Sequence, residues 1–75
     1  MAETGAEWIA RFAEEASARE PSEAEIERLL RLASVAAHSS ERLAAPIACW
    51  IAGVAGLDLD EAIALAERVG AAEGS

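Results

Sequence analysis

The sequence contains no lysine, asparagine, glutamine or tyrosine, and it has only one cysteine, two prolines and 4% aromatic residues. A single cysteine excludes an internal disulfide framework, so a hydrophobic core must hold the fold together. No segment alternates between polar and apolar positions, which argues against a β-sheet. The apolar fraction is 53%, and much of it is alanine, the best helix former. We therefore expect an all-α protein.

Positive charge is also scarce, because six arginines face 14 acids and give a formal net charge of -8. Such a chain repels phosphate backbones and anionic lipid surfaces, so we expect neither nucleic acid nor a membrane as a partner. The uncharged stretch from Leu43 to Leu57 would span roughly 22 Å as a helix, less than the roughly 30 Å of a bilayer core. The N-terminus has no signal-peptide pattern. We expect a cytoplasmic, single domain over residues 1–75, with an ordered core at about 4–70 and a flexible tail at 71–75.

Three helix starts share one signature, a hydroxyl or carboxylate cap followed three residues later by a glutamate: Thr4 and Glu7, Ser22 and Glu25, Asp58 and Glu61. In this capping box the cap side chain accepts the amide hydrogen bond of the third helical residue, and the glutamate reaches back to the cap amide. We expect helices at about 5–19, 23–38 and 59–69, with Gly70 ending the last. Another helix should begin between Ser40 and Pro46 and end at Gly56.

The helix expected at residues 23–38 has a core-facing stripe made of Ile26, Leu29, Leu30, Ala33, Ala36 and Ala37, which Leu32 and Val35 widen. On the exposed faces of the first two helices, three acids stand four residues before an arginine and should pair with it: Glu7–Arg11, Glu15–Arg19 and Glu27–Arg31.

The uncharged helix has one bulky face, made of Ile47, Trp50, Ile51 and Val54, and one smooth face of small residues. A helix that is apolar all round is buried on every side, so we expect a compact four-helix bundle with short connections and this helix at its centre. The bulky face should fill the core. A face left over would be shared with a second copy, so we expect a homodimer whose interface comprises Trp8, Ala44, Ala48, Trp50, Ala52 and Gly56.

His38 and Arg42 lie four residues apart before the uncharged helix and flank two hydroxyls. One interpretation is a small-anion site made of His38, Ser39, Ser40 and Arg42 at a helix N-terminus. The other is structural: His38 neutralises the end of its helix, and Arg42 holds the turn by hydrogen bonds to loop carbonyls. The sequence favours the structural role.

Catalytic and metal sites are poorly supported. Cys49 lies inside the uncharged run, where a thiolate paired with His38 is disfavoured, and adjacent Ser39 and Ser40 do not suggest a triad. One cysteine and one histidine are too few for a zinc site. The acids Glu14, Glu15, Glu23 and Glu27 lack the Glu-x-x-His pattern of bundle metal sites. We expect no catalytic residues, no metal and no cofactor.

Residues 29–56 resemble a family of small helical domains of unknown function found mainly in actinobacteria. The matching residues are Leu30, Leu32, Ala33, Ala37, His38, Arg42, Ala45 and Pro46, and Trp8-Ile9 resembles the family's first helix. Many members have proline directly after the arginine, where this chain has Leu43. Members are sometimes associated with the guanylyltransferase that makes the guanine-dinucleotide form of the molybdenum cofactor. The resemblance thus implies an accessory role in molybdenum cofactor biosynthesis, because the Gly-rich loop and metal-binding acids of that enzyme are absent here.

Together these observations predict a non-enzymatic helical interaction module, with a homodimer and a protein of molybdenum cofactor synthesis as its expected partners. The alternative is a small-anion or nucleotide-binding domain that uses His38 and Arg42.

Overall fold

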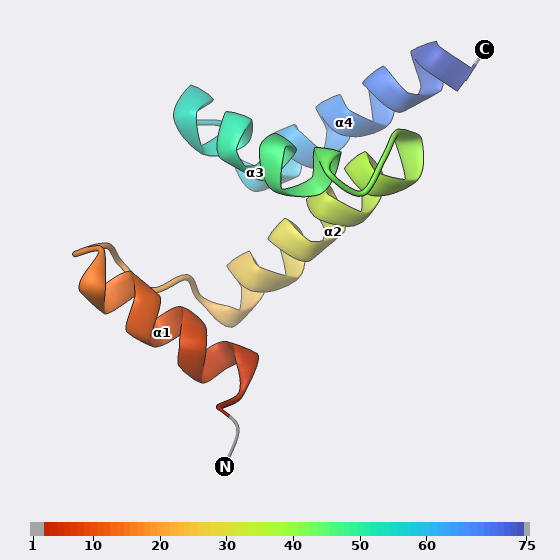
Figure 1. The fold of residues 1–75 in the computed structure, drawn as a ribbon. Coiled ribbons are helices and arrows are strands. Elements are labelled where there is room, and N and C mark those ends of the chain that lie inside the picture. The colour runs from red at the N-terminus through yellow and green to blue at the C-terminus, as the bar shows by residue number, and fades with distance from the viewer. Residues whose placement is uncertain (1–2, 75) are drawn as a thin grey trace.

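The computed structural model describes residues 3–74, which form four helices and contain no strand (Figure 1). The helices are α1 (Gly5–Glu15), α2 (Glu23–Ser39), α3 (Ala44–Ala55) and α4 (Leu59–Gly74). The connections between them are short. This confirms the predicted all-α helical bundle.

Local capping fixes where the helices begin. Thr4 accepts the Glu7 amide at 3.1 Å, and the Glu7 carboxylate accepts the Thr4 amide at 2.9 Å. Ser22 and Glu25 form the same reciprocal pair, at 3.1 and 2.8 Å. At the start of α4, the amide of Glu61, the third helical residue, donates to a carboxylate oxygen of Asp58 at 3.4 Å. The sequence signature therefore located all three starts.

The end of α1 differs from the prediction, because the helix stops at Glu15 rather than continuing to Arg19. Ser17 adopts a left-handed conformation with φ of 57°, and the Ala18 amide donates to the Ala13 carbonyl at 2.9 Å. This is the backbone pattern of a Schellman cap, in which a residue with positive φ closes the last turn. Glycine usually occupies that position, so a serine there does not signal the end of a helix.

The remaining boundaries depend on proline and glycine. α3 starts at Ala44, so Pro46 lies in its first turn, where the lack of an amide hydrogen is tolerated. Gly56 caps α3 with φ of 68°. Gly70 does not end α4, which continues to Gly74; the last residue of the predicted flexible tail, Ser75, lies outside the described residues. Gly70 instead packs against the Ser39 side chain, where a Cβ atom would clash.

The core lies around α2, which packs against both α3 and α4. Leu32 is only 2% exposed and forms a buried cluster with Ala52 and Ala62. Leu30, placed in the core by the sequence pattern, is 65% exposed instead. The expectation that α3 would be buried on every side is also wrong, because only one side of α3 packs against the rest of the chain.

Ion pairs join elements rather than lying along single helices. On α2, Arg28 pairs with Asp60 at 2.9 Å and Arg31 with Glu67 at 3.3 Å, both on α4. The expected pairs Glu7–Arg11, Glu15–Arg19 and Glu27–Arg31 do not form in the described structure, because each arginine has another partner. Arg11 pairs with Glu3, Arg19 with Glu25 and Arg31 with Glu67.

The connection between α1 and α2 is tied to the first turn of α2. Arg19 donates from Nη1 and Nη2 to the two carboxylate oxygens of Glu25, at 2.8 and 2.9 Å. The same carboxylate accepts the Ser22 amide. Mainly because of the hydrogen bond from Arg19, with the Ser22 amide as the next cause, the pKa of Glu25 falls from its ordinary value of 4.5 to about 2.

This lowered pKa predicts an acid-sensitive fold. The ionised Glu25 stabilises the folded chain above its unfolded-state pKa, and that contribution is lost as the pH falls from about 4.5 towards 2. We expect Glu25→Gln to lower the free energy of unfolding at neutral pH and to flatten its dependence on pH in that window. Chemical denaturation at a series of pH values measures both effects. Glu27→Gln, an exposed acid on the same helix, is the matched control, and equal slopes in the two variants would contradict the prediction.

Candidate functional site

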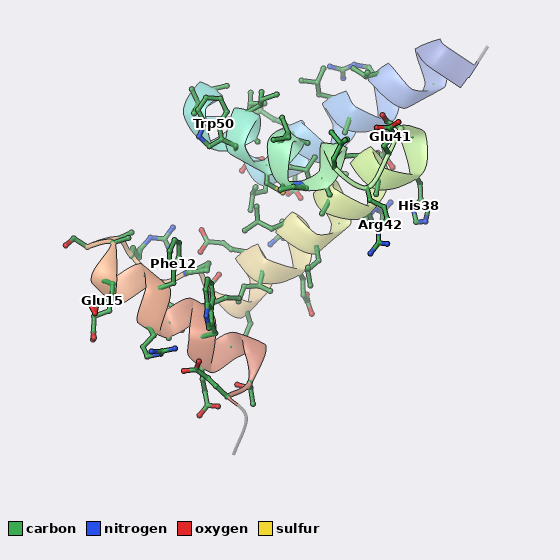
Figure 2. The ribbon with its side chains drawn as sticks, in the orientation of Figure 1. Phe12, Glu15, His38, Glu41, Arg42 and Trp50 are labelled. Carbon is green, nitrogen blue, oxygen red and sulfur yellow. The ribbon has the colours of Figure 1, made fainter. Side chains whose placement is uncertain are left out.

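The turn between α2 and α3 is held by backbone hydrogen bonds. The Ala44 amide donates to the Glu41 carbonyl at 2.9 Å, and the Ala45 amide donates to the Arg42 carbonyl at 3.2 Å. Within residues 3–74 the guanidinium of Arg42 makes no hydrogen bond or ion pair and is exposed (Figure 2). The predicted hydrogen bonds from the Arg42 side chain to loop carbonyls therefore do not form within the described residues. The backbone carbonyl of Arg42 helps to hold the turn instead, and the guanidinium points to solvent.

The four residues of the predicted anion site have different neighbours. His38 Nδ1 lies 3.2 Å from Ser34 Oγ, one turn back on the same helix. The Ser39 side chain lies against Gly70 of α4. Ser39 and Ser40 also line an apolar groove, which His38 and Arg42 do not. The structure places all four residues at one end of α2 but does not bring their polar atoms together.

Cys49 lies on the inner side of α3. Its thiol is directed to the Leu29 carbonyl, 3.9 Å from Sγ, and its side chain packs against the core cluster. Burial raises the pKa of the Cys49 thiol, so the reactive thiolate is disfavoured. Within the part of the chain that the structure describes, no three histidine, cysteine, aspartate or glutamate side chains are grouped to hold a metal.

The two faces of α3 are placed in the opposite way to the prediction. Its small residues face inward: Ala52 is buried, and Ala44 and Ala48 are partly buried. Its large residues face outward and form an exposed patch, called here the α3 ridge: Ile47, Trp50, Ile51 and Val54. Small side chains allow α3 to approach α2 closely, which explains why the smooth face was selected for the core.

Beside the α3 ridge lies an apolar groove of about 370 Å³. α3 and α4 both pack against α2, and the groove lies between these two helices above the C-terminal half of α2. Its lining is apolar or glycine apart from two serines: Leu32, Ala36, Ser39, Ser40, Ala44, Ala48, Ile51, Ala52, Leu57, Ala62, Leu65, Ala66, Val69 and Gly70. Ile51 belongs to both the ridge and the groove, so the two form one continuous apolar surface.

A second apolar patch lies on α1. The rings of Trp8 and Phe12 stack with centroids 5.1 Å apart and planes 14° apart. Both side chains are more than half exposed. Of the residues predicted for the dimer interface, Trp8, Trp50 and Gly56 are therefore accessible, whereas Ala52 is in the core.

Residues 1–74 match the model of a family described as a domain of unknown function (DUF6457). Because the match covers nearly the whole chain, the protein belongs to this family. This confirms the predicted membership of a family of unknown function, without any link to particular organisms or to molybdenum cofactor synthesis. No curated protein and no solved structure matches the chain. No helix within residues 3–74 has both the length and the apolar character needed to cross a membrane.

The environment of Cys49 predicts a slow thiol. Because burial raises its pKa and limits access, we expect Cys49 in the folded protein to react much more slowly with a thiol reagent than in the denatured chain. The time course of labelling at neutral pH, with and without denaturant, measures the difference. Equal or faster labelling of the folded protein would show an activated thiol. That result would contradict the prediction and support a role in thiol catalysis.

Proposed function

We propose that this protein is a non-enzymatic, cytoplasmic interaction module that binds a partner helix through the α3 ridge and the adjoining groove. One observation carries the proposal: the only long uncharged segment, Leu43 to Leu57, has its large side chains exposed instead of buried. Trp50 is 66% exposed and Ile51 is 53% exposed. Contiguous apolar surface of this kind is typical of protein-binding sites.

The exposed area supports a second copy of the chain as the partner. A folded monomer of 7.8 kDa should expose about 4,400 Å². The chain exposes 5806 Å², an excess of about 1,400 Å². A stable interface of standard size buries about 800 Å² on each partner, so the excess is large enough for a homodimer.

The distribution of charge restricts where two copies can meet. Two chains that each carry a net charge of -8 repel one another over most of their surfaces. Contact at the α3 ridge avoids this repulsion at short range, since the ridge lies within the uncharged segment. It also buries no unpaired charge, which would be costly.

A non-enzymatic role is supported by the chemistry of the polar groups. The Cys49 thiol is kept protonated, and His38 is hydrogen-bonded to a serine of its own helix. Binding of a small anion or nucleotide at His38 and Arg42 stays an alternative prediction, which the dispersed arrangement of the four polar side chains does not favour.

The resemblance described above suggests a more specific role, as an accessory protein in assembly of the guanine-dinucleotide form of the molybdenum cofactor. This part of the proposal rests on the resemblance alone. If it is correct, the purified protein should bind a molybdenum cofactor guanylyltransferase in a direct pull-down assay, and Ile51→Glu should weaken that binding. No retention of the enzyme by the unmodified protein would contradict it.

Self-association is tested by sedimentation at a series of protein concentrations. We expect the unmodified protein to form dimers and Ile51→Glu to be a monomer. Ile51→Ala should weaken the dimer about tenfold or more, since loss of a covered isoleucine costs about 1.5–3 kcal/mol. Leu30→Glu is the matched control, because Leu30 is also a large exposed aliphatic residue but lies on α2, outside the ridge and the groove. A strictly monomeric unmodified protein at high micromolar concentration would exclude the dimer.

A further inference from the structure

We propose that the groove between α3 and α4 receives α1 of a second copy, with Trp8 and Phe12 inserted into it, and that the exchange is reciprocal. The proposal rests on the self-association proposed above and specifies its geometry. In this mode of recognition an amphipathic helix places its apolar side in a hydrophobic groove.

α1 has the properties of such a helix. Its apolar stripe comprises Trp8, Ile9, Phe12 and Ala13, and of these only Ala13 is buried in the single chain. Glu7 and Glu14 lie on the opposite side, whereas Arg11 and Glu15 flank the Trp8 and Phe12 rings. The stacked Trp8 and Phe12 rings form the largest apolar feature of the stripe, and a fully covered aromatic side chain buries about 150–250 Å².

The connection between α1 and α2 explains why the occupant comes from another chain. The bidentate pair between Arg19 and Glu25 anchors the connection at the first turn of α2. The groove lies along the C-terminal half of α2, from Leu32 to Ser40, and so begins about 10 Å beyond Glu25 along the helix. Figure 1 accordingly shows α1 beside the start of α2 and away from α3 and α4. α1 therefore extends from its own chain as an arm whose Trp8 and Phe12 side chains stay exposed.

Area fits this occupant. In a reciprocal exchange each chain contributes its arm and its groove. This combination uses the excess of about 1,400 Å² that the single chain exposes, and it leaves α1 no longer projecting into solvent.

Disulfide trapping between two different variants tests the exchange. In a Cys49→Ala background, one chain carries Phe12→Cys and the other Val69→Cys, which places one thiol on the arm and one in the groove. The two chains are mixed and oxidised, and the mixed disulfide is measured by mass. The matched control replaces Phe12→Cys with Glu14→Cys, on the opposite side of α1. We expect roughly tenfold more mixed disulfide with Phe12→Cys, because the bond requires Cβ atoms about 3.5–4.5 Å apart.

The outcomes separate this proposal from the proposed function. Dimers by sedimentation with equal trapping at positions 12 and 14 would overturn the arm exchange and leave self-association standing. Monomers would overturn both. A disulfide formed within one chain that carries both Phe12→Cys and Val69→Cys, in preference to one between chains, would show that α1 folds back on its own groove and would also overturn the exchange.

Tryptophan fluorescence gives a second test that needs no cysteine. In Trp50→Phe the only tryptophan is Trp8, and its emission should shift to shorter wavelength as the concentration rises through the monomer–dimer transition. The double variant Trp50→Phe with Ile51→Glu should show no such shift, because Ile51→Glu is expected to keep the protein monomeric. Emission that stays constant while dimers form would mean that α1 remains in solvent, and the exchange would be wrong.

Discussion

The packing of two helices against α2 is the constraint on which the rest of the structure depends. Among the residues whose burial the structure describes, Leu32 is the one large side chain almost completely buried at this contact, and its buried partners are alanines of α3 and α4. With so little volume available inside, close approach of the backbones takes the place of large interlocking side chains. Gly70 contributes to this approach, because its missing side chain leaves room for Ser39.

The arrangement of α3 follows from that constraint. The helix has an apolar residue on every side, so hydrophobicity alone does not decide which side faces α2. The small residues face α2 because they permit a shorter distance between the helices, and the bulky residues lie on the outside. The candidate site is thus a direct result of how the core is built, since the surface proposed to bind a partner consists of what the core could not accommodate.

Features that depend on neighbouring residues could be predicted from the sequence, whereas features that depend on distant ones could not. The capping residues Thr4 and Ser22 and the left-handed Gly56 determine local hydrogen bonds, and the structure agrees with each of them. The inner side of α3 and the exposure of Leu30 depend on which helices meet, and the apolar pattern was compatible with either arrangement. The early end of α1 was missed because a serine adopts the conformation usually reserved for glycine.

The way α1 is attached also divides the molecule into parts of different stability. α2, α3 and α4 share one buried cluster, whereas α1 is connected through exposed hydrogen bonds at Arg19 and Glu25 and adds only Ala13 to the buried residues. Segments with few buried contacts open locally without unfolding the rest of a protein. In the single chain, the backbone amides of α1 should therefore exchange with solvent hydrogen through brief openings of that helix alone, while those around Leu32 exchange only when the whole core comes apart.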